Sequence, residues 1–354
     1  MIAVYVTLGA FLLSLCFVAF VLYVSRKRSW FDHHDERKIH TGQVPRLGGI
    51  GFATAFVIVT AATMAIDQVP SLGPRLIPVL FAFPLVLAFG VVDDFRSLRP
   101  RYKLLVQSGA AIIVMAAGFT FRSIDFSTMG FNLDLGLFRF PLTFLWIVGI
   151  TNALNFIDGV DGLAGGVSAL AALGYAAIFA AAGNEKTAIL CLALAAAVGG
   201  FLVFNAPFPK ARIFMGDGGS QFLGFTLALL PLLDDGVGQA ILPLPFAAAI
   251  LLIPGLDMLA AIWRRTRDGR RIDSPDKAHM HHKLMSLGLG ALGVDALFWG
   301  LQVMLGVLVF ISRKSAGVMA LAFLLTAYIL ACAFFIVIHY LNRAEIARSA
   351  RTKS

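Results

Sequence analysis

The sequence predicts an all-α integral membrane protein with about eleven transmembrane helices, and three observations support this. Of its 354 residues, 59% are hydrophobic and only 14% are charged, whereas a soluble domain carries roughly 25% charged residues. The mean hydropathy is +0.84. The apolar residues fall into successive runs, and about 20 such residues are needed for a helix to cross a bilayer. The three cysteines lie inside these runs, so neither a disulfide framework nor a zinc site is indicated.

The predicted helices follow one another along nearly the whole chain. We expect them near residues 3–24, 47–66, 75–92, 104–121, 141–156, 163–182, 187–204, 219–233, 241–262, 293–312 and 316–341. The eighth is short, which favours a tilted or partly re-entrant segment. Residues 122–140 alternate partly between apolar and polar side chains and contain glycine, which predicts an external hairpin. The chain 1–354 is interpreted as one membrane domain, with a basic cytoplasmic tail at 342–354.

The charge pattern predicts the orientation of these helices. No basic residue precedes the first apolar run, and Arg26, Lys27 and Arg28 follow it directly, as in an uncleaved helix whose N-terminus lies outside. The connections that then fall in the cytoplasm are rich in Lys and Arg; Arg313 and Lys314 are the exception. The net charge of +9 is thus assigned to cytoplasmic loops rather than to a nucleic-acid partner, and the C-terminus is predicted to be cytoplasmic.

Clusters of polar side chains that could bind ligands or take part in catalysis fall at the cytoplasmic ends of the predicted helices. In "FGVVDDFRSLRPRYKLL", Asp93 and Asp94 close one apolar run and Lys103 begins the next. An interfacial turn with snorkelling cations would account for a single acid. Two adjacent acids repel each other, so a bound cation is the competing explanation.

The stretch "TNALNFIDGVDGLAGG" is the strongest of these clusters. Asp158 and Asp161 are three residues apart among glycines, with Asn152 and Asn155 just before them. On a helix the two acids would share a face, and the glycines permit tight turns or close approach to a ligand. A solvated helix break would explain the glycines but not the density of polar groups. Ionisable residues in membrane segments favour a functional site.

Two further motifs combine glycine or histidine with cations. "FNAPFPKARIFMGDGGSQFLGF" places Asp217 in a Gly-rich turn that enters a helix, where backbone N–H groups could receive phosphate oxygens. The spacing matches no P-loop, so a simple Gly-rich turn stays open. "RIDSPDKAHMHHKL" holds His279, His281 and His282 among Lys and Arg, without a zinc pattern. A basic solvated loop is the alternative to phosphate binding by imidazolium groups and Lys283.

Together, five carboxylates and several cations are predicted to meet at one membrane face. Mg²⁺ binds one or two carboxylates together with substrate phosphates, and cationic side chains suit phosphate oxygens. The residues thus predict Mg²⁺-assisted phosphoryl transfer between a soluble nucleotide and a membrane lipid. An ion-coupled transporter is the rival interpretation, but it predicts acids near the bilayer midplane and a repeat between the two halves, and the sequence has neither.

The motifs "DERKIHTGQVPRLGGIGF", "VVDDFRSLRPRYKLLVQ", "NALNFIDGVDGLAGG", "ARIFMGDGGSQFLGF" and "SPDKAHMHHKLM" occur in this order over roughly residues 32–287. They resemble the polyprenyl-phosphate N-acetylhexosamine-1-phosphate transferases, glycosyltransferase family 4. The similarity is greatest to the bacterial branch that moves N-acetylglucosamine-1-phosphate onto undecaprenyl phosphate. "HMHH" and eleven spans favour this branch over the one that transfers phospho-N-acetylmuramoyl-pentapeptide.

The resemblance implies a Mg²⁺-dependent phosphoglycosyl transferase, with Mn²⁺ as the alternative metal, in the bacterial inner membrane with its catalytic side cytoplasmic. UDP-GlcNAc and undecaprenyl phosphate are the implied substrates, and UMP is released. The product would start a cell-envelope polysaccharide: O-antigen of lipopolysaccharide, capsule, teichoic acid or exopolysaccharide. Another UDP-N-acetylhexosamine or phospho-N-acetylmuramoyl-pentapeptide stays open as donor. The family resemblance is compatible with a homodimer.

The resemblance also implies roles for single residues. Asp93 and Asp94 match an acidic pair near the lipid phosphate, with Asp93 the candidate for deprotonating it. Asp217 matches the principal magnesium ligand, assisted by Asp94. Asp158 and Asp161 match a catalytic pair that lines the nucleotide-sugar site. The positions expected to bind substrate are Lys103, Asn152, Asn155, Asn205, Phe214, His279, His281 and His282. Direct attack on the β-phosphorus is favoured over a covalent aspartyl-phosphate, and both routes stay open.

Overall fold

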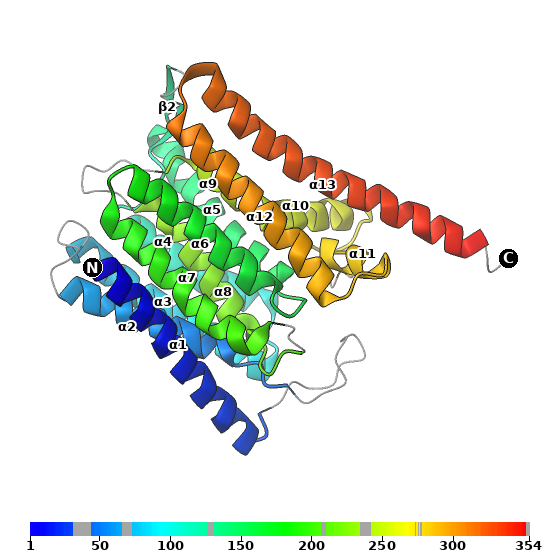
Figure 1. The fold of residues 1–354 in the computed structure, drawn as a ribbon, viewed down its shortest axis with the longest axis horizontal. Helices are drawn as coiled ribbons and strands as arrows, with labels where there is room; N and C mark the ends of the chain where they lie inside the picture. Colours follow the sequence, from blue (N-terminus) through cyan, green and yellow to red (C-terminus); the bar gives the residue numbers. More distant parts are fainter. Residues whose placement is uncertain are drawn as a thin grey trace.

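The protein is a bundle of helices that run between two ends of the molecule (Figure 1). The computed structural model describes residues 1–30, 44–65, 73–126, 130–206, 210–233, 242–272, 274, 276 and 278–351. Residues 35–43, half of the first family-like motif, therefore lie outside the described residues. The two chain termini lie at opposite ends of the molecule, and the C-terminal helix extends beyond the bundle.

Helices account for nearly all of the described elements. The α-helices are α1 (Ile2–Lys27), α2 (Gly48–Ala65), α3 (Gly73–Arg96), α4 (Pro100–Ala116), α5 (Arg139–Ile157), α6 (Leu163–Ala181), α7 (Glu185–Asn205), α8 (Gly216–Leu229), α9 (Leu244–Ile250), α10 (Leu252–Arg267), α11 (Met280–Ser286), α12 (Ala291–Lys314) and α13 (Gly317–Arg351). The shorter elements are β1 (Ser123–Phe126), β2 (Phe131–Asp134), η2 (Gly136–Phe138) and η3 (Leu230–Leu232).

Each of the eleven predicted ranges overlaps one helix or, in one case, a bent pair of helices. Among the described residues, eight helices are long and apolar enough to cross a membrane, and α9 with α10 makes up to nine as one broken span bent by 84°. The prediction of an all-α integral membrane protein is confirmed. α4 and α8 have 17 and 14 residues, so they are shorter than those eight.

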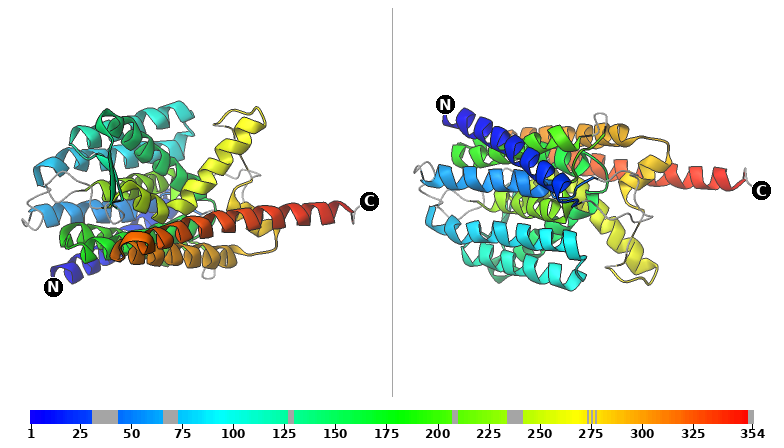
Figure 2. Two further views of the ribbon diagram at one scale, coloured as in Figure 1. Left: turned by 90° about the horizontal axis from the view of Figure 1, so that it is seen from above. Right: turned by 90° about the horizontal axis from the view of Figure 1, so that it is seen from below.

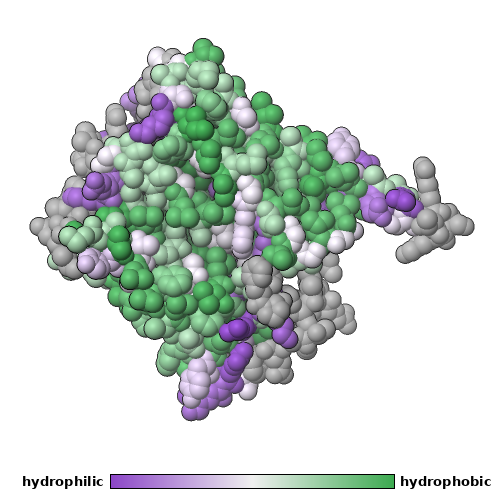
Figure 3. All heavy atoms as spheres, viewed as in Figure 1, coloured by the Kyte–Doolittle hydropathy of each residue, from purple (hydrophilic) through white to green (hydrophobic). Residues whose placement is uncertain are grey.

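The outer surface agrees with a membrane location. On the face shown in Figure 3, apolar residues cover most of the bundle and strongly hydrophilic residues gather towards its margins. Large apolar side chains such as Phe20, Phe81 and Ile329 are more than 60% exposed. Helices that are apolar on every side are expected where lipid replaces water around them.

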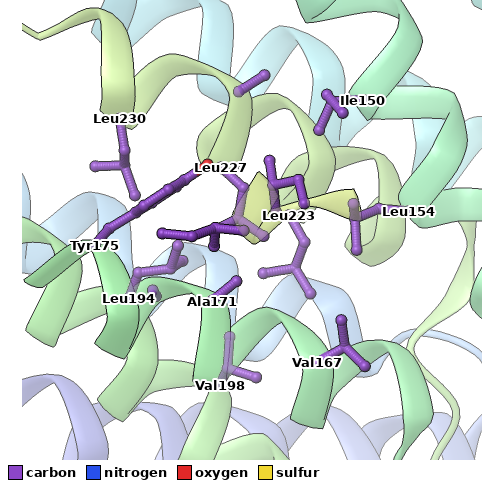
Figure 4. Close-up of a cluster of buried hydrophobic side chains, with 14 of the residues drawn as sticks. Ile150, Leu154, Val167, Ala171, Tyr175, Leu194, Val198, Leu223, Leu227 and Leu230 are labelled. Atoms are coloured by element: carbon purple, nitrogen blue, oxygen red, sulfur yellow. The ribbon is translucent and has the colours of Figure 1, made fainter. Parts of the chain in front are cut away.

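The core is built around α8. Of its 14 residues, every one except Asp217 is buried. One side packs aromatic rings: Phe222 contacts Phe52, Phe56 and Phe83, with ring centroids 5.5 to 6.1 Å apart. The other side packs aliphatic side chains of α5, α6 and α7 (Figure 4). α8 is thus a fully enclosed helix that presents one carboxylate at its first turn.

Glycine allows α8 to lie this deep in the bundle. A Cβ on Gly49 of α2 would come 2.3 Å from Gly219 Cα, and one on Gly90 of α3 would come 2.4 Å from Gly218 Cα. These distances are shorter than any van der Waals contact, so the backbones touch. The glycines after Asp217 therefore serve close helix packing.

Three elements at the C-terminal end differ from the prediction. α11 lies inside a segment that was expected to be a loop. α13 continues as one helix through Arg351, so the described part of the predicted tail is not a separate segment. α10 leaves the bundle after the bend, towards the end where α13 projects (Figure 2). The hairpin expected in residues 122–140 is confirmed, because β1 and β2 pair antiparallel.

Candidate active site

The first part of the site is the corner between α3 and α4. Asp93 Oδ1 accepts the N–H of Leu98 at 2.7 Å, which closes the turn after α3. Ser97 takes a left-handed conformation, with φ of 46°, and Pro100 supplies the first residue of α4. This sharp reversal brings Lys103, one turn into α4, back to the carboxylate of Asp93.

Lys103 joins two acids from different helices. Its Nζ forms an ion pair with Asp93 Oδ2 and lies 2.8 Å from Asp217 Oδ2 on α8. Asn155 on α5 donates to the other oxygen of Asp217, Oδ1, at 3.0 Å and to Ser220 Oγ at 2.8 Å. The side chain of Asp93 is 2% exposed and that of Asp217 is 26% exposed, so a substrate reaches Asp217 first.

Asp94 makes different contacts from Asp93. Its Oδ1 accepts the N–H of Asp217 at 2.8 Å and its Oδ2 accepts that of Gly218 at 3.2 Å. The carboxylate therefore caps α8 from another helix, where its charge also suits the helix dipole. Gly216 makes room with φ of 77°, since a Cβ there would lie 2.7 Å from Asp94 Oδ2. Two backbone N–H groups of the Gly-rich turn, where phosphate oxygens were expected, thus bind a carboxylate. We call Asp93, Asp94, Lys103 and Asp217 the acid–lysine cluster.

The acid–lysine cluster is suited to a metal only in part. Among the described residues, no three His, Cys, Asp or Glu side chains converge as a metal-binding group. Asp93 and Asp217 do converge on one cation, the Lys103 ammonium, which contacts an oxygen of each carboxylate. Mg²⁺ needs only one or two carboxylates when phosphates and water complete its shell. The residues thus fit a metal that arrives with a phosphorylated substrate.

The second part of the site is the turn between α5 and α6, residues 158–162, which we call the DGVDG loop. The helix break predicted here is confirmed: α5 ends at Ile157, and Gly162 has φ of 84°. Asp158 and Asp161 thus lie on a loop rather than on one helical face. Loss of hydration, reinforced by the charge of Asp217, raises the pKa of Asp158 to about 8.

Two of the predicted substrate-binding amides are engaged inside the protein. Asn205 Oδ1 accepts the N–H of Gly162 and its Nδ2 donates to Ile213 O, both at 3.0 Å. Asn205 thereby ties the DGVDG loop to the segment before α8. Asn152 Nδ2 donates to Gln107 Oε1 at 2.7 Å, and Gln107 Nε2 donates to Gln221 Oε1 at 3.1 Å. This chain of amides links α5, α4 and α8 behind the acid–lysine cluster.

The third part is the histidine segment, residues 279–282. His281 lies against the DGVDG loop so closely that a Cβ on Gly159 would be 2.5 Å from His281 Nε2. The His279 ring is parallel to it, with centroids 5.8 Å apart, and the His282 ring is 4.3 Å from it. Burial, helped by His282, lowers the pKa of His281 to about 3. His281 is therefore neutral, so the predicted imidazolium role does not apply to it.

A carboxylate on α10 holds the start of the histidine segment. Asp257 is 1% exposed. Its Oδ2 lies 2.8 Å from His279 Nδ1, and its Oδ1 accepts the N–H of Met280 at 2.9 Å. The second bond caps α11. Lys283 is also buried, but its Nζ lies 3.4 Å from His339 Nδ1 on α13, away from the DGVDG loop.

Two arginines of α10 hold the chain before α11. Arg264 forms an ion pair with Asp276, with Nη2 and Nε 2.7 and 3.2 Å from Oδ2. Arg265 Nη1 donates to Ile272 O at 2.6 Å, and its guanidinium lies over the Phe156 ring at 5.3 Å. α10 thus connects the histidine segment to the end of α5.

The sequence prediction missed Asp257 and Asp295, which are single acids inside apolar runs. Asp295 on α12 is fully buried, and within the described chain neither carboxylate oxygen has a hydrogen-bond partner. A lone ionisable residue in a membrane segment is itself a functional signal. Gln107 and Gln221 were also missed. Phe214 is half-buried before α8, and its backbone pairs with Pro45 and Gly48.

Comparison with known proteins identifies a family that shares these segments of the chain. Residues 76–233 match the model of glycosyl transferase family 4. A probable undecaprenyl-phosphate N-acetylglucosaminyl 1-phosphate transferase of Bacillus subtilis (strain 168) is 37% identical over 260 residues, 73% of this chain and 70% of the relative. A decaprenyl-phosphate N-acetylglucosaminephosphotransferase of Mycolicibacterium smegmatis is 33% identical over 72% of this chain and 68% of the relative.

A third relative covers more of the molecule. The undecaprenyl-phosphate alpha-N-acetylglucosaminyl 1-phosphate transferase of Yersinia pestis is 32% identical over 334 residues, which is 90% of this chain and 88% of the relative. The matched segments contain the acid–lysine cluster and the DGVDG loop. The chain belongs to glycosyl transferase family 4.

Proposed function

We propose that the protein transfers N-acetylglucosamine-1-phosphate from UDP-GlcNAc to undecaprenyl phosphate and releases UMP. The observation that carries this proposal is the Lys103 ammonium between Asp93 and Asp217, beside a loop of two further acids and a histidine segment. Such a site suits a polyanionic substrate brought to a membrane surface. The names of the similar proteins support the sugar and the polyprenyl phosphate.

The reaction is a displacement at phosphorus. A phosphate oxygen of the lipid forms a bond to the β-phosphorus of the donor, and the bond from that phosphorus to the bridging oxygen breaks. UMP leaves with the electron pair. Because the nucleophile already carries negative charge, the protein contributes mainly by positioning and charge neutralisation. Lys103 is the proposed cationic contact, and the imidazole groups of His279 and His282 are proposed to hydrogen-bond the donor.

Asp93 and Lys103 are proposed to act together on the acceptor. In the structure Asp93 Oδ2 is covered by the Lys103 ammonium. When Lys103 turns towards an incoming phosphate, Asp93 Oδ2 becomes free to accept the proton of that phosphate, which is the base role that the family resemblance implies. Asp94 stays on the N-terminus of α8 and keeps Asp217 in place.

We infer that Mg²⁺ is held by Asp217 with Asp93 beside it, rather than by Asp217 with Asp94. Both oxygens of Asp94 accept backbone N–H groups, whereas Asp93 and Asp217 face a common point. When bound, the metal supplies a Lewis acid for the diphosphate oxygens. Asn155 orients the Asp217 carboxylate through its bond to Oδ1.

The nucleotide and sugar are proposed to bind over the DGVDG loop. Asp161 and Asp158 offer acceptors for hydroxyl or N–H groups, and the half-buried Phe214 offers a ring for the uracil. Asn205 is proposed to shape this pocket through the loop, because its own amide is bonded to Gly162 and Ile213.

The lipid is proposed to approach from the side of α10. This helix leaves the bundle, and its Leu259 and Trp263 are 58% and 69% exposed. We propose eleven crossings of the bacterial inner membrane, with the N-terminus outside and the site in the cytoplasm. The basic end of α1, Arg26 and Lys27, lies at the end required by this orientation.

The test is UMP release by purified protein in detergent with undecaprenyl phosphate and UDP-GlcNAc, with and without Mg²⁺. Metal-dependent release that disappears in Asp217→Asn supports the proposal. Release only with another UDP-N-acetylhexosamine, or with a phospho-N-acetylmuramoyl-pentapeptide donor, keeps the reaction class and changes the sugar. No release with any donor from folded protein overturns the transferase and favours the transporter.

A further inference from the structure

We propose that Asp257 is a positioning residue for His279, which holds the ring proton on Nδ1 and directs the lone pair of Nε2 to a hydroxyl or N–H group of the donor. This inference rests on the proposed transferase function and adds a residue from α10 to it. Asp257 lies outside the motifs described above and outside residues 76–233 that match the family model.

The surroundings of the Asp257 carboxylate suit this positioning role. Asp257 is 1% exposed, and an isolated buried carboxylate is costly unless hydrogen-bond donors surround it. It has two such donors, His279 Nδ1 at 2.8 Å and the N–H of Met280 at 2.9 Å. A carboxylate only accepts, so the proton of the neutral ring must reside on Nδ1. His279 Nε2 is then the nitrogen left for a ligand.

The remaining contacts place that nitrogen at the donor site. The ring of His279 is parallel to that of His281 and 5.6 Å from Phe156 at the end of α5. His281 in turn lies against Gly159 in the DGVDG loop. Met280 is buried and begins α11, so a shift at Asp257 would move both histidines together.

The pair also decides which group the ring can bind. With the proton held on Nδ1, Nε2 presents a lone pair, which accepts a hydrogen bond from a hydroxyl or N–H group of the donor. The carboxylate of Asp257 on the opposite nitrogen makes that lone pair a stronger acceptor. Asp257 is thus inferred to raise the affinity for the donor without touching it.

Four variants test the pair. Asp257→Asn keeps the shape and removes the charge. His279→Asn keeps a nitrogen donor where Nδ1 stood and removes Nε2, whereas His279→Gln places a nitrogen near Nε2. Asp268→Asn is the matched control, because it breaks the exposed ion pair with Arg267 at the end of the same helix. Each variant is first checked for a single monodisperse species in detergent.

We expect Asp257→Asn to raise KM for UDP-GlcNAc about tenfold, the lower end of what removing a carboxylate partner of a functional histidine causes. KM for undecaprenyl phosphate and kcat should change less. His279→Asn should fold like the wild type and lose as much donor affinity as His279→Gln or more. Adding Asp257→Asn to His279→Asn should cost nothing further, because the carboxylate acts through the ring. Asp268→Asn should stay within about twofold of wild-type KM.

Two outcomes overturn the inference while the wild type remains active. One is a His279→Asn variant with wild-type KM, which would make the pair purely structural. The other is additive losses in the double variant, which would show that Asp257 does not act through His279. A wild type that releases no UMP would instead overturn the proposed function, so the two failures are distinguishable.

Discussion

The acid–lysine cluster and the histidine segment are held in place by different means. The acid–lysine cluster joins α3, α4 and α8 inside the bundle, and its acids are matched by Lys103 or by the N-terminus of α8. The histidine segment is held from outside the central bundle by Asp257 of α10, and Lys283, which follows it, contacts His339 of α13. One region is assembled before any substrate arrives, and the other is attached to the helices nearest to the proposed lipid path.

This difference predicts different responses to substitution. In the acid–lysine cluster, removal of one partner leaves a buried charge unpaired, so stability and catalysis should fall together. In the histidine segment, the rings touch the DGVDG loop by packing, so moderate changes should act mainly on donor affinity.

The largest effect is expected at Asp217, the one residue of α8 that is not buried. Asp217→Asn removes the charge that faces Lys103 and the proposed metal and keeps the shape of the side chain. We expect UMP release to fall by about a thousandfold, on the order of 4 kcal/mol in the barrier. Steady-state kinetics at saturating Mg²⁺ measure this. Activity above a tenth of the wild-type value would exclude Asp217 from the reaction centre.

Lys103→Met should produce the next largest effect, and it should lower both stability and activity. Asp93 and Asp217 then face each other without the ammonium, and we expect a loss of about 3 kcal/mol, as for other broken buried pairs. If the acid pair is where a dication binds, Mg²⁺ should restore part of this loss. Thermal unfolding in detergent, with and without Mg²⁺, would show a larger rise of Tm in the variant than in the wild type.

An equal rise of Tm in both proteins would place the metal elsewhere. Asp134→Asn serves as a control, since this acid lies in the exposed β2 strand. Its Tm should be unaffected by Mg²⁺ beyond the wild-type response.

The same comparison explains what the sequence alone could reveal. Long apolar runs predicted every helix that spans the bundle, because length and composition decide whether a helix suits a bilayer. Asp93 and Asp217 could be assigned to one site because both follow or begin apolar runs at the same membrane face. The clustering of these acids could therefore be predicted from the sequence.

The internal use of Asn152 and Asn205 could not be predicted. Both looked like ligand-binding amides in the sequence, but each is engaged by protein partners from distant segments. Asp257 was missed for the opposite reason, because it stands alone in an apolar run and its partner His279 comes 22 residues later, beyond the end of α10. Tertiary contacts of this kind leave no local pattern.

The contact between Gly159 and His281 allows a smaller and more local test. Gly159→Ala would place a Cβ 2.5 Å from His281 Nε2, so the ring must shift. We expect a cost of about 2 kcal/mol, seen mainly as a higher KM for the donor, since overpacking of this type costs 1–3 kcal/mol. Gly109→Ala in α4 is the control, because nothing lies within 4 Å of its new methyl group. Equal kinetics in both variants would contradict the packing of the histidine segment on the DGVDG loop.

The smallest effect concerns pH and follows from the neutral His281 ring. Burial lowers its pKa to about 3, whereas the unfolded chain has an ordinary histidine with a pKa near 6.5. Between these values the unfolded state binds the extra proton, so this contribution to stability is present above pH 6.5 and is lost as the pH falls. We expect about 1 kcal/mol less stability at pH 5.5 than at pH 6.5 from this group.

His281→Asn removes the titrating ring, so the variant should lose less stability than the wild type over the same interval. Unfolding midpoints in urea at pH 5.5, 6.5 and 7.5 would measure the difference, and the other titrating groups cancel in the comparison. Parallel curves for the two proteins would mean that the ring is hydrated in the folded state. The histidine segment would then stand away from the DGVDG loop, and the contrast with the acid–lysine cluster would be greater still.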